Sequence, residues 1–310
     1  MQSQLKHVIS ADQFLDRTLL DKLFSLAQEM EAHDTNGKYR TALAGKILAT
    51  VFYEPSTRTR FSFEAGMMKL GGEVLTTESA AQFSSAIKGE SIEDSIRIIG
   101  GYADAIVLRH PQTGAAKIAA KVSPVPVINA GDGSGEHPTQ ALLDLYTISK
   151  EKKSLDGLHI AMVGDLLYGR TVHSLLKFLP LYKKITLYLV APAKLQLPQI
   201  YLEYLKKHKI SFQQLSDFKS ILPKLDVLYM TRVQKERFAD PNEYEQVKNL
   251  YVIDEKNIKA MKKSAMIMHP LPRVTELSPK IDNDPRAWYF RQAQNGLYVR
   301  MALLYTLLCR

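Results

Sequence analysis

Short apolar runs alternate with amphipathic stretches along the chain, which is the pattern of strands joined by crossover helices in a parallel sheet. The candidate strands are Ile47 to Tyr53, Ala105 to Leu108, Val125 to Asn129, His159 to Val163, Ile185 to Val190, Val227 to Met230 and Ala265 to Met268. The stretches whose apolar residues recur three and four apart, as in helices packed on a sheet, are Glu90 to Ile99, Thr139 to Ser149 and Thr171 to Leu179. The pattern predicts an α/β fold.

A charged segment near the middle of the chain marks a domain boundary. The helix predicted up to Ser149 is followed by Lys150-Glu151-Lys152-Lys153, and a new strand begins at His159. We therefore predict two domains, each a mostly parallel sheet flanked by helices. In such sheets ligands bind beyond the carboxyl ends of the strands, so the residues after each strand are the candidates for chemistry.

Composition narrows the class of protein. Of the 310 residues, 45% are apolar, and 41 basic against 32 acidic side chains give a formal charge of +9. The basic residues are dispersed in pairs, without a long arm or aromatic ladder, which disfavours nucleic-acid binding. Cys309 is the only cysteine, which excludes an internal disulfide framework and a multi-thiolate metal cluster. We expect a soluble, cytoplasmic protein, because no apolar run is long enough to span a bilayer and no export signal is recognisable.

The first candidate anion site follows the strand that ends at Tyr53. Pro55 precedes Ser56-Thr57-Arg58-Thr59-Arg60, and a helical pattern begins within this run. A helix N-terminus directs free backbone N–H groups outward, and arginines beside hydroxyls add donors for a phosphate. Ser56 is placed to cap the helix. The alternative is an ordinary capped helix with exposed arginines, but a cap needs neither Arg58 nor Arg60.

Two further segments follow strand ends in the first half. Arg109-His110-Pro111 comes after Leu108, and His137-Pro138-Thr139-Gln140 comes after a glycine-rich turn. An arginine suits phosphate or a carbonyl oxygen, a histidine can polarise a carbonyl, and a glutamine can bind an amide. A structural role for the histidine stays open. The turn is not a P-loop, since no Lys-Ser or Lys-Thr follows it, and His137 begins no His-Glu-x-x-His zinc motif.

In the second half, two arginines follow predicted strands. Arg170 ends the segment Gly164 to Arg170, which lacks the glycine spacing of a dinucleotide-binding turn. Arg232 and Gln234 follow the strand that ends at Met230. Two guanidinium groups suit the two carboxylates of a dicarboxylate substrate. The alternative is a pair of surface arginines on loops, and these residues alone do not decide between the two.

The order and spacing of these motifs resemble the aspartate transcarbamoylase family across nearly the entire chain. The motifs that carry the resemblance are Ser56-Thr57-Arg58-Thr59-Arg60, Arg109-His110-Pro111, His137-Pro138-Thr139-Gln140, Gly164-Asp165 to Arg170, Thr231-Arg232-Val233-Gln234 and His269-Pro270-Leu271-Pro272-Arg273. The resemblance implies a carbamoyl-phosphate-binding domain over residues 1–150, joined by a C-terminal helix 291–310, and an aspartate-binding domain over residues 151–290. It also implies carbamoyl transfer from carbamoyl phosphate to L-aspartate in pyrimidine synthesis.

The resemblance assigns roles to matching positions. Carbamoyl phosphate would be bound by Ser56, Thr57, Arg58, Thr59, Ser84, Arg109, His137, Gln140, Pro270, Leu271 and Pro272. The catalytic residues among these would be Arg58, Thr59, Arg109 and His137. The two carboxylates of aspartate would be bound by Lys88, Arg170, Arg232 and Gln234. Ile87 is a departure, since some relatives carry a second lysine there.

The resemblance also implies partners. Ser84 and Lys88 would reach a neighbouring subunit's site, so a homotrimer with shared active sites is expected, and regulatory chains in a larger assembly stay open. Orientation of two anions and cationic stabilisation of an oxyanion would supply the catalysis, so no metal and no cofactor are expected. Neither nucleic acid nor a membrane is expected as a partner.

Two alternative functions fit the sequence less well. Ornithine transcarbamoylases resemble the first half but typically have a cysteine in the segment matched by His269 to Pro272, and a Ser-Met-Gly motif in the second domain; this chain has neither. A basic nucleic-acid-binding module, or a catalytically silent regulatory partner, would be expected to have substitutions among the assigned positions. None of those positions is substituted.

Overall fold

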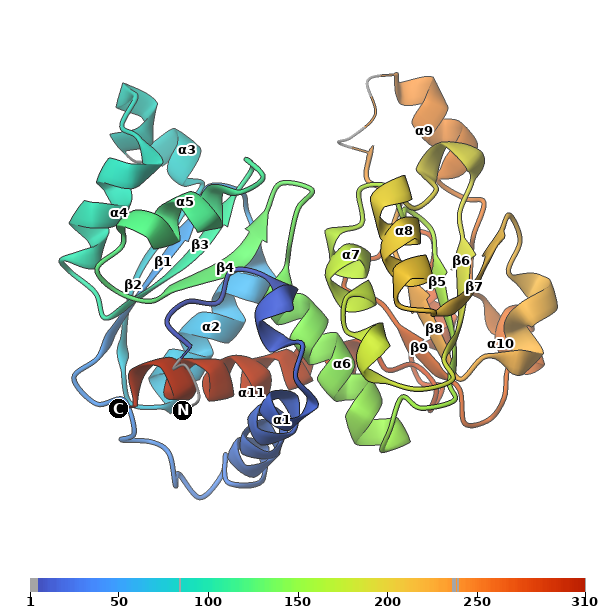
Figure 1. The fold of residues 1–310 in the computed structure, drawn as a ribbon, viewed down its shortest axis with the longest axis horizontal. Helices are drawn as coiled ribbons and strands as arrows, with labels where there is room; N and C mark the ends of the chain where they lie inside the picture. Colours follow the sequence, from blue (N-terminus) through green and yellow to red (C-terminus); the bar gives the residue numbers. More distant parts are fainter. Residues whose placement is uncertain (1–4, 84, 236–237, 239, 310) are drawn as a thin grey trace. The chain divides into compact units, whose positions relative to one another are not determined.

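The computed structural model describes residues 5–83, 85–235, 238 and 240–309. The chain divides into two compact units, each with its own sheet (Figure 1). Unit 1 comprises Met1–Tyr146 and Gln294–Arg310, and unit 2 comprises Thr147–Ala293. The C-terminal segment therefore belongs to the same unit as the first half of the chain.

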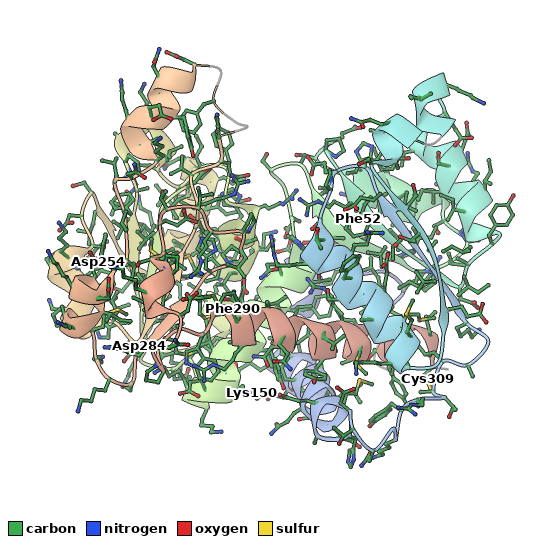
Figure 2. The ribbon with its side chains drawn as sticks, turned by 180° about the vertical axis from the view of Figure 1, so that it is seen from behind. Phe52, Lys150, Asp254, Asp284, Phe290 and Cys309 are labelled. Carbon is green, nitrogen blue, oxygen red and sulfur yellow. The ribbon has the colours of Figure 1, made fainter. Side chains whose placement is uncertain are left out.

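Unit 1 contains a parallel four-stranded sheet, in the order β2-β1-β3-β4. Its strands are β1 (Ile47–Phe52), β2 (Glu73–Glu78), β3 (Ala105–His110) and β4 (Val127–Asp132). Phe52 pairs with Arg109, and Leu108 pairs with Asn129, so the parallel strands β1, β3 and β4 end on the same side of the sheet. Figure 2 labels Phe52, which marks that side. The first candidate segments all begin there.

Helices cover both faces of the unit 1 sheet. They are α1 (Arg17–Ala32), α2 (Thr57–Lys69), α3 (Ala80–Phe83), α4 (Ile92–Gly100), α5 (Ala115–Val122), the start of α6 (Pro138–Lys152) and most of α11 (Tyr289–Leu308), with short 3-10 turns η1 (Ala11–Phe14) and η2 (Ser85–Lys88). Figure 1 shows α4 and α5 on one side of the sheet and α2 and α11 on the other. The core between them is apolar, with Phe52, Phe63 and Met67 fully buried.

Unit 2 contains a parallel five-stranded sheet, in the order β7-β6-β5-β8-β9. Its strands are β5 (His159–Val163), β6 (Thr186–Val190), β7 (Ser211–Leu215), β8 (Val227–Met230) and β9 (Met266–Met268). The helices and 3-10 turns are α7 (Arg170–Leu176), η3 (Leu179–Leu181), η4 (Ala193–Leu195), α8 (Gln199–Lys207), η5 (Lys219–Lys224), α9 (Pro241–Val247), α10 (Glu255–Ala260) and η7 (Pro279–Ile281).

The predicted fold class, two mostly parallel sheets flanked by helices, is confirmed. Two strands, β2 and β7, were missed because they lie at sheet edges and many of their side chains are exposed. The helix predicted from Thr171 to Leu179 is shorter, since α7 ends at Leu176 and a 3-10 turn containing Pro180 follows. No helix in the described part of the chain is long and apolar enough to cross a membrane.

Candidate functional site

The first candidate segment lies where β1 turns into α2. Ser56 occupies the N-cap position, but its hydroxyl makes no capping hydrogen bond, contrary to the expected cap. Thr57 and Arg58 are exposed at the first turn of α2, whereas Thr59 is buried. The positive end of the helix dipole and the adjacent hydroxyls and guanidinium form a suitable environment for a phosphate.

The two arginines of this segment differ in their contacts. Arg60 lies within ion-pair distance of Glu64 (3.6 Å) and Glu78 (3.2 Å), and it donates to the Thr76 hydroxyl at 3.0 Å. Glu78 also accepts the backbone N–H of Ser56 at 3.1 Å. Arg60 and the Ser56 N–H therefore tie α2 to β2.

Arg109, the next candidate along the chain, lies near the end of β3. Its guanidinium lies 3.7 Å from a Glu54 carboxylate oxygen and donates to the Ala130 carbonyl at 3.3 Å. These contacts join the ends of β1, β3 and β4 around one cation. His110 packs edge-on against Tyr53 at a ring distance of 4.5 Å, and burial lowers the pKa of His110. A half-buried imidazole with a lowered pKa supports packing against Tyr53 rather than phosphate binding.

The turn before His137 is held by one buried carboxylate. Asp132 accepts the backbone N–H groups of Gly114 at 2.8 Å and Glu136 at 2.9 Å, and the side-chain amide of Asn129 at 3.2 Å. Gly133, with φ of +51°, has no room for a Cβ, which would lie 2.7 Å from the Pro111 carbonyl oxygen. Asp132 therefore sets where α6 begins, directly after His137.

His137 and Gln140 are both buried at the start of α6. The His137 carbonyl accepts the backbone N–H groups of Gln140 and Ala141, so the helix begins at this residue. The Gln140 side-chain amide donates to Asp144 Oδ1 at 2.9 Å. A carboxylate accepts but does not donate, so the amide nitrogen faces Asp144 and the amide oxygen stays available to a ligand N–H.

The segment expected to reach a neighbouring subunit, which carries Ser84 and Lys88, is only partly described. Ser84 lies outside the described residues, so its predicted role has no structural test. Lys88 ends the 3-10 turn η2 and is exposed, and Ile87 beside it is 65% exposed. An exposed ammonium group at this place is compatible with a contact to another chain.

In unit 2, one buried carboxylate organises the candidate aspartate-binding segments. Asp165 accepts the Tyr168 backbone N–H at 2.9 Å and the Gln234 amide at 3.4 Å. Its own N–H donates to the Thr231 hydroxyl at 2.9 Å. Burial raises the pKa of Asp165, opposed by these hydrogen bonds. The loops after β5 and β8 are thus joined, with Gln234 between them.

The two candidate arginines of unit 2 lie close to the ends of regular elements. Arg170 is the first residue of α7, and Arg232 lies in the loop after β8; both are partly buried. Gly164, with φ of +118°, approaches Thr231 so closely that a Cβ would lie 2.3 Å from its carbonyl oxygen. This contact requires glycine and brings the two loops together within unit 2.

The segment after β9 is held by a buried histidine and glutamate. His269 Nδ1 accepts the Leu271 N–H at 2.7 Å, so Nε2 carries the proton and donates to Glu276 at 2.8 Å. Burial raises the pKa of Glu276, but the hydrogen bonds from His269 and from two backbone N–H groups outweigh this, so the net pKa is lowered. The Pro270, Leu271 and Pro272 backbone is thereby fixed, with Leu271 at φ of +55°.

The structure thus brings the candidates together in two sets. Within unit 1, Ser56 to Thr59, Arg109, His137 and Gln140 follow β1, β3 and β4; within unit 2, Arg170, Arg232, Gln234 and Pro270 to Pro272 follow β5, β8 and β9. The carboxylates that hold these segments were missed, namely Glu78, Asp132, Asp144, Asp165 and Glu276. The only sequence signal was their closeness to the motifs.

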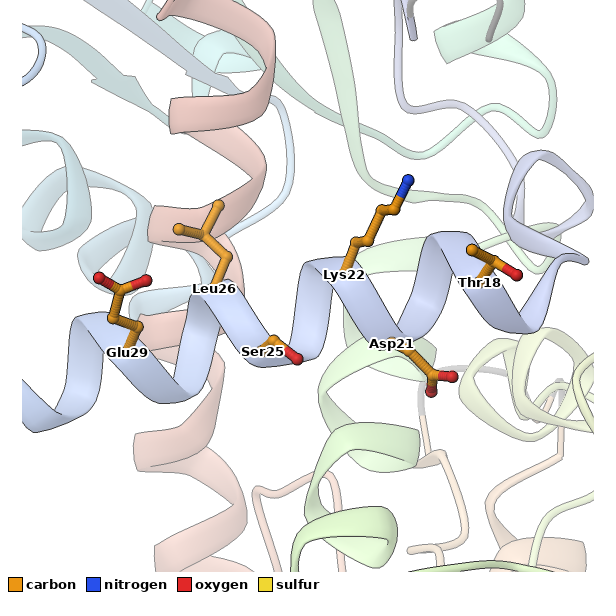
Figure 3. Close-up of a pocket in the computed structure, with 6 residues that line it drawn as sticks. All are labelled: Thr18, Asp21, Lys22, Ser25, Leu26 and Glu29. Carbon is orange, nitrogen blue, oxygen red and sulfur yellow. The ribbon is translucent and has the colours of Figure 1, made fainter.

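Neither a metal centre nor the surface hollow in the described part of the chain accounts for the candidate residues. Among the described residues, no group of three or more His, Cys, Asp or Glu side chains could hold a metal ion. A surface hollow lies along α1, lined by Thr18, Asp21, Lys22, Ser25, Leu26 and Glu29 (Figure 3). Because one helix forms it and it contains none of the predicted residues, it is not the candidate site.

Two family models match the chain. The model for the "Aspartate/ornithine carbamoyltransferase, carbamoyl-P binding domain" matches residues 6–150. The model for the "Aspartate/ornithine carbamoyltransferase, Asp/Orn binding domain" matches residues 156–307. Together they cover nearly the whole sequence, and they confirm the resemblance inferred from the motifs.

Individual relatives are similar over nearly the same span. The chain is 51% identical over 311 residues to the chloroplastic aspartate carbamoyltransferase of Oryza sativa subsp. japonica, covering 98% of this chain and 85% of that one. It is 51% identical over 300 residues to the aspartate carbamoyltransferase catalytic subunit of Methanocaldococcus jannaschii, covering 97% of each.

Solved structures give the same result. The catalytic subunit of M. jannaschii aspartate transcarbamoylase matches with a TM-score of 0.89 at 50% identity, covering 97% of each chain. Aspartate transcarbamoylase from Trypanosoma cruzi in complex with N-(phosphonacetyl)-L-aspartic acid matches with a TM-score of 0.91 at 42% identity, covering 98% of this chain and 96% of that one.

Proposed function

Because this chain belongs to the aspartate/ornithine carbamoyltransferase family, we propose that it transfers the carbamoyl group of carbamoyl phosphate to the amine of L-aspartate. The products are N-carbamoyl-L-aspartate and phosphate, in the de novo synthesis of pyrimidines. The observation that carries this choice is the 51% sequence identity, over nearly the full chain, to proteins named aspartate carbamoyltransferase from a plant and an archaeon. The Arg232-Val233-Gln234 segment supports it, because it offers a second anion site.

Carbamoyl phosphate binds at the carboxyl edge of the unit 1 sheet. Its phosphate is held by the hydroxyls of Ser56, Thr57 and Thr59 and the N–H groups from Thr57 to Thr59 at the start of α2. The Arg58 and Arg109 guanidinium groups and Ser84 of a neighbouring subunit complete the set. Exposure of Thr57 and Arg58 and the unused Ser56 hydroxyl at the N-cap support this role. Charge-assisted hydrogen bonds of this kind are about twice as strong as neutral ones.

The carbamoyl group points away from the phosphate donors. Thr59, Arg109 and His137 polarise its carbonyl oxygen, and stabilise the negative charge that develops there. Gln140 Oε1 and the backbone carbonyls around Pro270, Leu271 and Pro272 accept from its amide N–H groups. The hydrogen bond from Gln140 to Asp144 supports this orientation, since it leaves the amide oxygen to accept.

Aspartate is recognised by its two carboxylates. Arg170 and Arg232 each bind one, with Gln234 beside Arg232, and Lys88 of a neighbouring subunit adds a further cation. The closeness of the loops after β5 and β8, through Asp165 and Thr231, supports a shared role for these residues. Guanidinium forks match carboxylate geometry better than ammonium groups do.

The reaction needs no covalent enzyme intermediate. The uncharged amine attacks the carbamoyl carbon, an N–C bond forms, and a tetrahedral intermediate carries negative charge on the former carbonyl oxygen. The C–O bond to phosphate then breaks, and the leaving phosphate takes up the proton that the nitrogen loses. The protein contributes orientation of two anions and preorganised donors around the oxyanion, which supply several kcal/mol each.

The active unit is a homotrimer in the cytoplasm, with sites shared between subunits. Lys88, exposed on a short turn, supports a contribution in trans. The lone cysteine, Cys309, fits a reducing compartment, although several plant relatives are named as chloroplastic. Regulatory chains bind in a larger assembly only if the trimer offers them a surface, which sedimentation with candidate chains would test.

The test is carbamoyl-amino-acid formation by the purified protein, given carbamoyl phosphate and either L-aspartate or L-ornithine. Turnover with aspartate alone is expected, and Arg58→Ala should abolish it without changing the melting temperature. Exposed Arg97, paired with Asp94 on α4, provides the matched control Arg97→Ala. Turnover with ornithine instead would move the protein to the sister activity, and turnover with neither would refute the proposal.

Sharing of sites is tested by mixing two inactive variants, Arg58→Ala and Lys88→Ala, after dissociation and reassembly. A trimer whose sites combine residues of two chains should regain activity in about a quarter of its sites. Mixtures that remain inactive would show that each chain completes its own site.

A further inference from the structure

A buried polar cluster lies directly behind the start of α6. Gln140 donates to Asp144 one helical turn later at 2.9 Å, and Asp144 is 0% exposed. Removing a carboxylate from water is costly unless a cation or several donors compensate it. The charge of Asp144 acts on a buried cation, Arg300, on the C-terminal helix α11.

Arg300 is buried to the same degree, with 3% of its surface exposed. Burial lowers its pKa to about 10, opposed by the charge of Asp144, so the guanidinium is still charged at neutral pH. Its Cζ lies 5.1 Å from the centre of the Phe63 ring on α2. A buried arginine therefore faces helix α2 and the charge of helix α6 together, within unit 1.

Two hydrogen bonds connect Arg300 to the candidate anion site. Arg300 Nη1 donates to the Ser62 hydroxyl at 2.8 Å, and that hydroxyl donates to the Thr59 carbonyl oxygen at 2.9 Å. Helices α2 and α11 approach closely here, since a Cβ on Gly66 would lie 3.2 Å from Met301 Cγ. Figures 1 and 2 show α11 running beside α2 in both views.

Gly296 makes room for this arrangement. A Cβ at that position would lie 2.7 Å from Arg300 Nη1 and 2.9 Å from Leu143 Cδ2. Its φ is not in the left-handed region, so the requirement for glycine here is space rather than backbone conformation.

We propose that Asp144 and Arg300 are positioning residues that set the specificity of this site for a carbamoyl group. Asp144 fixes the Gln140 amide so that its oxygen, and not its nitrogen, faces the substrate. Arg300 compensates Asp144 and, through Ser62, holds the turn that carries Thr59. The C-terminal helix α11 thereby connects Gln140, which binds the carbamoyl amide, with Thr59, which polarises the carbamoyl carbonyl.

This inference rests on the proposed function, and it makes a prediction about selectivity. An acceptor aimed at the substrate nitrogen favours carbamoyl phosphate over acetyl phosphate, which has a methyl group in place of the NH2. Buried polar groups that lose their partner are the usual source of such discrimination. In Asp144→Asn, residue 144 can donate or accept, so the Gln140 amide can turn over and present its nitrogen instead.

The experiment measures the dissociation constants of carbamoyl phosphate and acetyl phosphate by calorimetry, with the full-length protein and its variants. The preference for carbamoyl phosphate should fall about tenfold in Asp144→Asn, as expected for one misdirected hydrogen bond. Gly296→Ala, which displaces Arg300, should lower the preference in the same direction. A preference within twofold of that of the unsubstituted protein in both variants would overturn the inference.

Folding is controlled in two ways. The double variant Asp144→Asn with Arg300→Met removes both buried charges, so it should fold even if the single variant does not, and should show the same reduced preference. Asp104→Asn is the matched control, because Asp104 pairs with Lys46 and the Ile47 N–H at the start of β1, away from the candidate residues. It should lower stability without changing the preference.

The two proposals fail separately. Turnover with aspartate together with an unchanged preference in Asp144→Asn would sink the positioning role and leave the proposed function intact. Absence of turnover, with a preference for carbamoyl phosphate that Asp144→Asn loses, would refute the proposed function and support the positioning role. An unsubstituted protein that binds both phosphates equally would overturn the positioning role as well.

Discussion

The two units hold their candidate residues by different means. In unit 1, Asp132 and Asp144 make hydrogen bonds of 2.8 to 2.9 Å that fix the turn before α6 and the Gln140 amide. In unit 2, the Gln234 amide makes longer contacts, 3.2 Å to the Tyr168 carbonyl and 3.4 Å to Asp165. Short bonds from buried carboxylates keep donors in place before a ligand binds, which lowers the cost of binding.

This difference suggests a division of labour. The unit 1 residues would contact the reacting carbamoyl group, where errors of position are costly to the rate. The unit 2 arginines would contact carboxylates remote from the bond that forms, where adaptation on binding is tolerated. Substitutions in unit 1 should therefore act mainly on kcat, and substitutions after β8 mainly on the KM for aspartate.

The largest effect is expected for Arg109→Met, which keeps the length of the side chain and removes its charge. Loss of a cation shared by the phosphate and the developing oxyanion should lower kcat about 10³-fold. Steady-state rates with saturating substrates measure this. Arg97→Met is the matched control on α4 and should be unaffected; a kcat loss below tenfold for Arg109→Met would contradict its catalytic role.

Arg232→Met should act differently. Removing one of two carboxylate partners should raise the KM for aspartate about 100-fold, while the dissociation constant of carbamoyl phosphate stays unchanged. Initial rates over a range of aspartate concentrations, with calorimetry for carbamoyl phosphate, separate the two quantities. Equal weakening of both would mean that the units do not divide the substrates as proposed.

Glu276→Ala concerns the segment after β9, where a buried carboxylate accepts a short hydrogen bond, as in unit 1. It leaves His269 Nε2 and the N–H groups of Val274 and Thr275 without their acceptor, so the free energy of unfolding should fall by about 3 kcal/mol. Chemical denaturation measures this. Exposed Glu73, on the edge strand β2, gives the matched control Glu73→Ala, with a change below about 0.5 kcal/mol.

The smallest predicted effect is a loss of folding stability at low pH. The Arg286 guanidinium beside Asp284 lowers the pKa of that carboxyl (Asp284 is labelled in Figure 2). A lowered folded-state pKa contributes stability above the unfolded pKa of about 4, and this stability is lost as the pH falls through the folded value. Because the pair is partly exposed, the contribution should be below about 1 kcal/mol.

Denaturation at pH 5 and pH 3 tests this, with Asp284→Asn compared to the unsubstituted protein. The unsubstituted protein should lose more stability over this interval than the variant does. Asp21→Asn, on the exposed face of α1 (Figure 3), should behave like the unsubstituted protein. Identical losses of stability in all three proteins would show that the Asp284–Arg286 pair does not make stability depend on pH.

Much of the fold was predictable from local pattern. The inner strands β1, β3, β5 and β8 read as continuous apolar runs because they are buried on both faces. The edge strands β2 and β7 were not predictable in this way, since one neighbour and many exposed side chains leave no such run. Pro124 and Pro126 explain why β4 begins at Val127 rather than at Val125.

The sequence by itself determined the fold class, the inner strands and the motifs that follow them, because apolar burial and helix period are encoded by neighbouring residues. Only the tertiary structure decided that Arg60 pairs with Glu64 and Glu78, that the Ser56 hydroxyl makes no cap, and that Arg300 is buried where the charge of Asp144 acts on it. The partner of a buried polar group is set by whichever distant segment packs against it, and that choice is made by the fold as a whole.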